Sequence, residues 1–165
     1  MADFNTAILT TLAREGGSRF TDDPNDRGGA TKYGISQRAY PNVDIKNLTE
    51  QQAREIYKRD YWDRLHCDEI NSQVIAEQLF DTAVNMGVRT AARLGQLALR
   101  IDPADGIIGG QSLAIINALS ESNQSLFLAN FTLAKIARYA YICNKDRSQS
   151  KYLLGWINRA LGGTA

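Results

Sequence analysis

The stretch that decides the fold is residues 4–36, FNTAILTTLAREGGSRFTDDPNDRGGATKYGIS. Its first part places Phe4, Ile8 and Leu12 at steps of four, with small or polar residues between them. Steps of four put apolar side chains on one face of a helix. The pattern therefore predicts an amphipathic helix over residues 3–15.

The segment after this helix changes character. Gly16 and Gly17 end the helix, because glycine readily adopts the backbone conformation found at helix C-termini. Residues 18–36 are polar and rich in glycine and turn formers, which predicts a structured loop or a short β-hairpin. Long glycine-rich loops in compact domains are often functional, so we expect this segment to contribute to a site.

The rest of the chain has helical periodicity. Thr49 followed by Gln52 predicts a capping box at the start of the next helix. We expect that helix to reach Tyr61, and further helices over residues 72–86, 89–100, 112–119, 125–144 and 151–161. The apolar residues expected on the inner faces of the third and fourth helices are Val74, Ile75, Leu79, Phe80, Ala83, Ala92, Leu94, Leu97 and Ala98. The predicted fold class is mainly α, in one domain over residues 1–165.

Composition excludes several function classes. The chain has 165 residues and a net charge of +1, without the basic excess expected of a nucleic-acid-binding protein. We expect Cys67 and Cys143 to be thiols and not a disulfide, because two cysteines do not make a disulfide scaffold. The N-terminus has no basic and apolar signal pattern, and no segment predicts stable membrane insertion. We therefore expect synthesis in the cytoplasm.

Glu15 is the main candidate for catalysis. At about 100° per residue, Glu15 lies within roughly 20° of both Phe4 and Ile8 around the helix. A carboxylic acid on an apolar stripe is partly desolvated, which favours its protonated form and suits a proton donor. From its position around the helix alone, Glu15 is slightly better interpreted as an ordinary surface acid than as a catalytic one. The acidic and hydroxyl residues that follow on the loop, including Asp22, Asp26 and Thr31, favour a catalytic one.

Metal-dependent and thiol chemistry are not indicated. Residues 23–28 begin like a calcium loop, but Arg27 and Gly34 occupy positions where oxygen ligands are needed. His66 is the only histidine and has no ligand spacing around it, so we expect neither a metal nor a cofactor. Cys67 beside His66 is adjacency in sequence without the spatial pairing of a thiol protease.

The order of motifs over residues 15–36 resembles glycoside hydrolase family 108, muramidases that include many phage endolysins. The matching parts are the EGG sequence at Glu15, the acidic turn at residues 22–26 and GGATKYGIS at residues 28–36. The resemblance implies a lysozyme-like fold and makes Glu15 the catalytic residue. It is less decisive for Asp26 and Thr31, because Asp22 or Asp23 could fill the role given to Asp26.

A second resemblance covers the C-terminal half. FDTAVNMG at residues 80–87 and DGIIGGQSL at residues 105–113 are similar to the predicted peptidoglycan-binding region that accompanies the family. This implies a catalytic lobe over residues 1–70 and a helical peptidoglycan-binding lobe over residues 71–165. Asp81 and Asn85 lie one helical turn apart and could bind substrate, although structural roles are equally compatible with their positions.

Aromatic residues are candidates for stacking against sugar rings. Tyr33, Tyr61, Trp62 and Trp156 combine flat faces with polar edges. We expect most of them to lie in the core. Tyr33, within the loop that follows the first helix, is the best candidate for substrate binding.

Three functional hypotheses follow. The first is hydrolysis of the β-1,4 bond between N-acetylmuramic acid and N-acetylglucosamine, leading to bacterial lysis. The second is lytic transglycosylation of the same bond, and the third is a non-catalytic peptidoglycan-binding module. Asp26 and Thr31 favour hydrolysis, because a second carboxylate and a water-holding hydroxyl serve that reaction. The resemblance to endolysins implies that the protein reaches the cell wall in the periplasm through a membrane lesion made by a partner such as a holin. We also expect a monomer.

Overall fold

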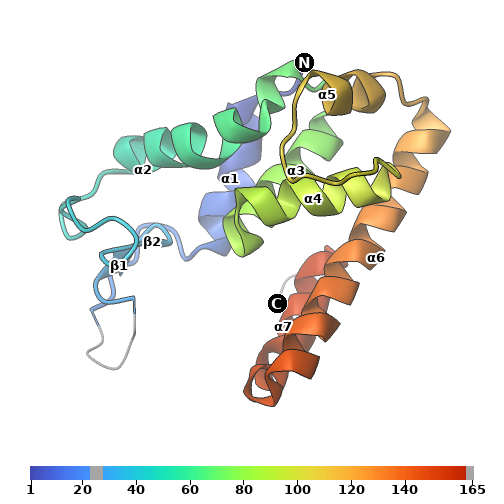
Figure 1. The fold of residues 1–165 in the computed structure, drawn as a ribbon. Coiled ribbons are helices and arrows are strands. Elements are labelled where there is room, and N and C mark those ends of the chain that lie inside the picture. The colour runs from blue at the N-terminus through green and yellow to red at the C-terminus, as the bar shows by residue number, and fades with distance from the viewer. Residues whose placement is uncertain (23–27, 163–165) are drawn as a thin grey trace.

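The computed structural model describes residues 1–22 and 28–162. Helices dominate this part of the chain, with one small antiparallel hairpin (Figure 1). The α-helices and strands are α1 (Phe4–Arg14), β1 (Thr31–Lys32), β2 (Ile35–Ser36), α2 (Glu50–Tyr57), α3 (Gln73–Met86), α4 (Val88–Ala98), α5 (Gly110–Asn117), α6 (Glu121–Lys145) and α7 (Leu153–Ala160). The mainly α prediction is confirmed.

Helix α1 follows the predicted pattern. Asp3 caps its N-terminus by accepting hydrogen bonds from the backbone N–H groups of Asn5 and Thr6. Phe4, Ile8 and Leu12 are buried, as their spacing predicts. Glu15 is the residue at the C-terminal cap, and the two glycines that follow have positive φ angles of 89° and 57°.

The core is organised around three aromatic rings from separate elements. Phe4 of α1 makes edge contacts with Trp62 and with Phe80 of α3, with ring centroids 5.5 and 6.0 Å apart. Trp62 and Phe80 are 5.5 Å apart and nearly perpendicular. Both are essentially inaccessible to solvent. Burial of side chains of this size stabilises the fold by roughly 2–3 kcal/mol each, so this trio fixes α1 against α3.

Helix α2 begins with the predicted capping box. The Thr49 side chain accepts from the Gln52 backbone N–H, and the Gln52 side chain accepts in return from the Thr49 backbone N–H. The helix continues into a π-helical turn, Lys58–Trp62, and then into two 3₁₀ turns, Asp63–Leu65 and Cys67–Glu69. Cys67 and Cys143 are both buried free thiols, as expected.

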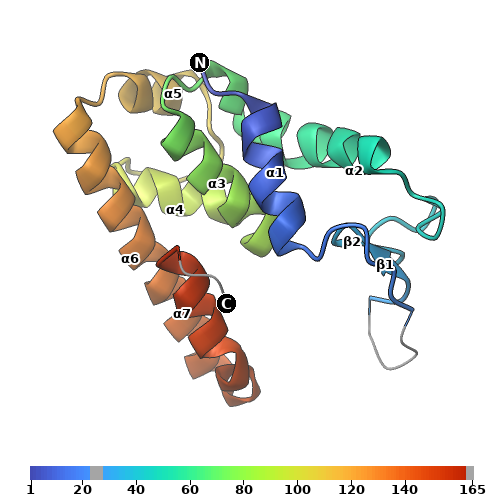
Figure 2. The same ribbon diagram turned by 180° about the vertical axis from the view of Figure 1, so that it is seen from behind.

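The C-terminal half is a group of packed helices. Helix α4 packs on α3 and on α6, and α7 returns along α6 after a 3₁₀ segment, Arg147–Tyr152. In both views the C-terminal end of α7 approaches the region where α1 and α3 end (Figures 1 and 2). This path brings the end of the chain back toward its beginning.

Two predicted core residues are exposed. Val74 and Leu97 are each 53% exposed, although most of the other residues expected on these faces are buried. Val74 lies in the first turn of α3, where Ile75 and Ala76 point inward instead. Leu97 lies near the end of α4, at the edge of a surface groove described below.

Some helix boundaries also differ from those predicted. Helix α6 begins at Glu121, before the predicted residue 125, because Ser120 caps it by accepting from the Asn123 backbone N–H. In the described part of the chain, none of the helices combines the length and apolarity needed to cross a membrane.

Candidate active site

Glu15 lies at the end of α1, where three parts of the chain meet. Its side chain is 23% exposed, so it is partly desolvated, as its position on the apolar stripe predicts. The backbone N–H of Glu15 donates to the carbonyl of Thr11, which completes the last turn of the helix. The carboxylate is therefore anchored by a rigid helix and remains accessible.

The β-hairpin packs directly on this carboxylate. Tyr33 and Gly34 form its two-residue turn, with φ angles of 54° and 74°. A Cβ atom at position 34 would lie 2.7 Å from Glu15 Cβ and 3.1 Å from Glu15 Oε2. Only glycine lets the hairpin approach so closely while adopting a positive φ.

Hydrogen bonds fix the hairpin in this place. The Tyr57 hydroxyl donates to the Tyr33 carbonyl at 2.8 Å, and the Tyr33 N–H donates to the Gly17 carbonyl at 3.1 Å. Burial, helped by the negative charge of Glu15, raises the pKa of Tyr57, which keeps its hydroxyl protonated and able to donate. The turn is therefore tied to both α1 and α2.

Arg159 of α7 reaches the same carboxylate from the far end of the chain. Its Nη2 atom lies 3.1 Å from Glu15 Oε1 and 3.0 Å from Asp81 Oδ1. Arg14 binds Asp81 from the other side at 2.9 Å. Burial opposes the charge on Arg159, but the hydrogen bonds and charges of Asp81 and Glu15 outweigh it and raise its pKa. Four charged groups thus form one chain of ion pairs.

Two further polar contacts lie beside this network. The buried Lys135 donates from Nζ to Gln78 Oε1 at 3.0 Å, and desolvation lowers its pKa even though Asp81 opposes this effect. The Tyr139 hydroxyl donates to Asn85 Oδ1 at 2.9 Å. The inner faces of α3 and α6 are therefore joined by polar groups next to the end of α7.

Two consecutive segments of the chain match models of known protein families. Residues 8–87 match the family model described as Glycosyl hydrolase 108, and residues 83–161 match the one described as Predicted Peptidoglycan domain. Residues 8–87 belong to the glycosyl hydrolase 108 family. The two matches support a glycoside hydrolase with a peptidoglycan-binding type of C-terminal segment, in agreement with both sequence resemblances.

A solved structure has a similar fold. The chain is similar to the structure of Brucella abortus SagA, with a TM-score of 0.70 and 24% sequence identity over 96% of this chain and 94% of that one. No curated protein sequence matches the chain. At this identity the likeness concerns the fold, and it extends over both family segments.

Within the glycosyl hydrolase 108 segment, the structure places the other predicted catalytic residues as follows. Thr31 is half-buried on β1, and its hydroxyl donates to the Gly29 carbonyl at 3.0 Å. Thr31 also pairs with Thr21 and Ser36 across backbone bridges. Asp26 lies outside the described residues. The catalytic roles of Glu15, Asp26 and Thr31 stay predictions.

The predicted substrate-binding residues have structural contacts of their own. Tyr33 is 8% exposed and belongs to the core, so only a small part of its surface faces solvent. Asp81 holds Arg14 and Arg159, whereas Asn85 accepts from Tyr139. Their part in substrate binding stays a prediction, but Asp81 does lie close to Glu15 through the shared guanidinium.

The remaining aromatic candidates lie mainly away from solvent. Trp62 is fully buried, as expected for most of this group. Trp156 is half-buried and stacks on Tyr139, with ring centroids 5.1 Å apart. Tyr61 is half-buried and lies 5.7 Å from Tyr57. Of these, Tyr61 alone is adjacent to a residue that contacts the hairpin turn.

The sequence analysis missed Arg159. It belongs to a family segment different from that of Glu15 and lies 144 positions away from it. Helical periodicity places a residue on a face of its own helix but does not indicate which distant helix that face meets. No signal in the single sequence connected α7 to the end of α1.

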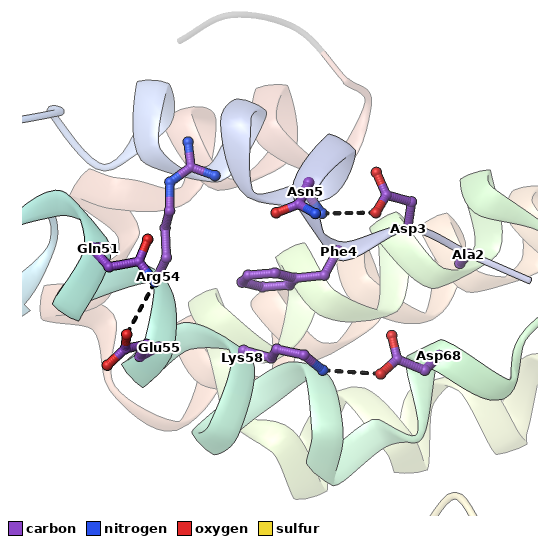
Figure 3. A pocket seen from close by; sticks show the side chains of 9 residues that line it. All are labelled: Ala2, Asp3, Phe4, Asn5, Gln51, Arg54, Glu55, Lys58 and Asp68. Carbon is purple, nitrogen blue, oxygen red and sulfur yellow. Dashed lines mark hydrogen bonds and ion pairs between the residues drawn. The ribbon is translucent and has the colours of Figure 1, made fainter.

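A separate cavity lies at the opposite end of α1. It has a volume of about 310 Å³ and is bordered by Phe4 and by charged residues such as Arg54, Lys58 and Asp68 (Figure 3). Lys58 is paired there with Asp68 at 2.9 Å, and Arg54 with Glu50 at 2.8 Å. Both cations that line the cavity are held in ion pairs, so neither is available to bind an anionic ligand.

No metal centre is found in the described parts of the chain, where no three acidic, histidine or cysteine side chains gather in a way that could hold an ion. His66 is exposed and pairs with Glu69 at 2.8 Å.

Proposed function

We propose that this protein hydrolyses the β-1,4 bond between N-acetylmuramic acid and N-acetylglucosamine in peptidoglycan, with Glu15 as the proton donor. The supporting observation is the position of Glu15, partly buried at the end of α1 and contacted by both the hairpin turn and Arg159. The two family matches support a glycosidase that acts on peptidoglycan.

In the proposed reaction, protonated Glu15 donates to the glycosidic oxygen while the bond to the sugar carbon breaks. Glu15 becomes a carboxylate at this moment. Arg159, 3.1 Å away, stabilises the negative charge as it forms, because a charge-assisted hydrogen bond strengthens when its acceptor ionises.

The oxocarbenium-like sugar then needs a negative charge and a water molecule. We assign the negative charge to Asp26 or to a neighbouring aspartate, as the family resemblance implies. We assign the water to Thr31, whose hydroxyl donates to Gly29 and so keeps its lone pairs free to accept from water. Deprotonated Glu15 can accept the proton of this water, which restores the acid.

Replacement of Glu15 by Gln tests the proposal. We expect Glu15→Gln to abolish the release of muropeptides with reducing ends from purified peptidoglycan while leaving binding to it intact, as measured by mass spectrometry and co-sedimentation. Glu121→Gln, a matched change at an exposed glutamate in the first turn of α6, should leave the rate unchanged. Unchanged release by Glu15→Gln contradicts the proposal and favours the non-catalytic binding module.

The products separate hydrolysis from lytic transglycosylation. Hydrolysis leaves a reducing N-acetylmuramic acid, whereas transglycosylation leaves a 1,6-anhydro end because the 6-hydroxyl of the same sugar attacks in place of water. A 1,6-anhydro product from the unmodified protein would keep Glu15 as the acid but remove the water-holding role of Thr31.

We further propose that the protein acts as an endolysin, made in the cytoplasm of a bacterial host and released to the wall in the periplasm by a holin. The resemblance to phage endolysins supports this role. Lysis of a bacterium that expresses the protein should require co-expression of a holin, and size-exclusion chromatography with light scattering should show a monomer. Lysis without a holin contradicts the release route.

A further inference from the structure

A second surface feature lies in the segment that matches the peptidoglycan domain. A groove of about 590 Å³ runs between α4 and α6. Arg89 and Arg93 of α4 line it on one side, and Arg138 and Tyr141 of α6 line it on the other. The proposed reaction at Glu15 uses none of these residues.

The three arginines lack a close acidic partner among the described residues. Arg89, Arg93 and Arg138 form no ion pair within 4 Å and no side-chain hydrogen bond there, and no acidic residue lines the groove. Asp105, outside the groove lining, interacts electrostatically with Arg89 alone of the three. Arg138 lies over the ring of Tyr141 at 5.4 Å. Arginine presents two parallel donors that match a carboxylate, so this arrangement favours an anionic ligand.

The floor of the groove is apolar and made of small or exposed aliphatic side chains. Ala134 and Ala137 of α6 lie opposite Leu94 and Leu97 of α4. Leu97 is 53% exposed, although its helical position predicts burial. A ligand that fits this lining carries several carboxylates together with small apolar groups.

The groove continues toward the hairpin side of the molecule. A neighbouring cavity of about 520 Å³ shares Arg89 and Thr90 with it and extends to Tyr61. The Tyr61 ring lies 5.7 Å from Tyr57, whose hydroxyl binds the turn that covers Glu15. The two cavities therefore form one continuous surface from the three arginines to Tyr61, which packs on a residue that holds the hairpin turn.

We propose that the groove between α4 and α6 binds the acidic peptide stem of peptidoglycan through Arg89, Arg93 and Arg138. This inference rests on the proposed function, because it assigns a subsite for the part of the same substrate that extends from the glycan. A peptide stem has free carboxylates at several positions and the methyl side chains of alanine, which correspond to the arginines and to the alanine- and leucine-lined floor.

The direct test measures peptide binding. The probe is the tetrapeptide L-Ala–γ-D-Glu–meso-diaminopimelate–D-Ala, titrated calorimetrically into the full chain. We expect Arg93→Gln and Arg138→Gln each to weaken binding by about tenfold, since a hydrogen bond to a charged group contributes at least that much. Arg147→Gln, a matched change at an exposed arginine that does not line the groove, should leave affinity within about twofold.

Three results would overturn the proposal. One is absence of binding by the unmodified protein, and another is equal affinity in the Arg93→Gln/Arg138→Gln double variant. The third is arginine-dependent binding to anionic lipid vesicles or to DNA without binding of the tetrapeptide. Circular dichroism of each variant checks that the fold is retained. We expect it to be retained, because the Arg93 side chain is exposed.

A second measurement separates this inference from the proposed function. The unmodified protein and the double variant are compared on intact peptidoglycan and on glycan strands stripped of peptides by an amidase. We expect equal cleavage of stripped strands and about tenfold slower cleavage of intact peptidoglycan by the double variant at limiting substrate. If the unmodified protein cleaves neither substrate, the hydrolase proposal is contradicted. The calorimetric titration then still shows whether the groove binds the peptide.

Discussion

The guanidinium of Arg159 lies 3.1 Å from the carboxylate of Glu15, although 144 positions separate the two residues. The contact joins the last helix described, α7, to the end of the first. It also places a residue from the peptidoglycan-domain segment against the candidate catalytic acid. The first prediction concerns this pair.

Arg159→Gln should lower the rate of the proposed reaction. Without the positive charge, the carboxylate formed on proton donation is less stable, and we expect the maximal rate to fall about 5- to 30-fold, equivalent to roughly 1–2 kcal/mol. Initial rates of muropeptide release at saturating substrate provide the measurement.

Arg14→Gln is the matched control for this prediction. Arg14 binds Asp81 at 2.9 Å and has no ion pair with Glu15 within the described structure. Arg14→Gln should lower the maximal rate much less than Arg159→Gln does. An equal loss of rate in both variants would contradict a specific effect of Arg159 on Glu15.

Gly34→Ala should damage both stability and activity. The new Cβ would lie 2.7 Å from Glu15 Cβ and from Tyr57 Oη, in a backbone conformation with a φ of 74°. Overlap and backbone strain together should cost about 2–4 kcal/mol of unfolding free energy, and relief of the overlap should displace Glu15. Urea unfolding and the rate of muropeptide release measure the two effects.

Gly155→Ala provides the contrasting glycine. Gly155 lies inside α7, where an added Cβ meets nothing within 4 Å. Alanine is the better helix former, so this variant should gain up to about 1 kcal/mol and keep its activity. A Gly34→Ala protein as stable and active as Gly155→Ala would show that the hairpin turn does not hold Glu15.

Tyr139 should make stability decrease in alkaline solution. Burial raises the pKa of Tyr139 from 10.0 to about 12, so the unfolded chain loses this proton before the folded one does. Its contribution is fully present below pH 10 and is lost between pH 10 and 12. From pH 9 to 11 the loss should be about 1 kcal/mol, which urea unfolding at the two pH values can measure.

Variants isolate this contribution from those of other titrating groups. Tyr139→Phe should be less stable at pH 9 by about 1 kcal/mol, because the hydrogen bond to Asn85 is lost, but it should lose less stability on going to pH 11. Tyr141→Phe changes an exposed tyrosine of the same helix and should keep the behaviour of the unmodified protein. Equal pH dependence in all three proteins would refute the role assigned to Tyr139.

Thr49→Ala should destabilise the protein without affecting catalysis. It removes the side chain that accepts from the Gln52 N–H at the start of α2, which should cost about 1 kcal/mol. Thr10→Ala, at an exposed position inside α1, has no capping bond to lose and should change stability by a few tenths of a kcal/mol at most. Activity is compared with the fraction of Thr49→Ala protein that is folded. If activity falls more than this fraction does, Thr49 has more than a structural role.

Local signals in the sequence predicted most of the fold. The steps of four from Phe4 to Leu12 and the capping box at Thr49 both have their expected geometry, because each depends on residues within a few positions of one another. Val74 and Leu97 were predicted wrongly as buried. Periodicity identifies an apolar face but not how far neighbouring helices extend over it.

The site was less predictable from sequence. The partial burial of Glu15 follows from its phase in α1, and that expectation is confirmed. Arg159 and Gly34 contact Glu15 through the tertiary packing of α7 and of the hairpin turn, which a single sequence does not encode locally. The same limit applies to Lys135, whose burial between α6 and α3 has no signal in the periodicity of α6.

The placement of α3 has a consequence for protein engineering. The two family segments overlap at residues 83–87, at the C-terminal end of α3, and this helix supplies Phe80 to the aromatic core and Asp81 to the ion pairs. A chimera joined at this overlap would replace Arg159, the partner of Glu15, together with the rest of the peptidoglycan-domain segment. Useful recombinants of this protein should therefore carry α7 along with α1, and exchange surface side chains of α4 and α6 instead of whole segments.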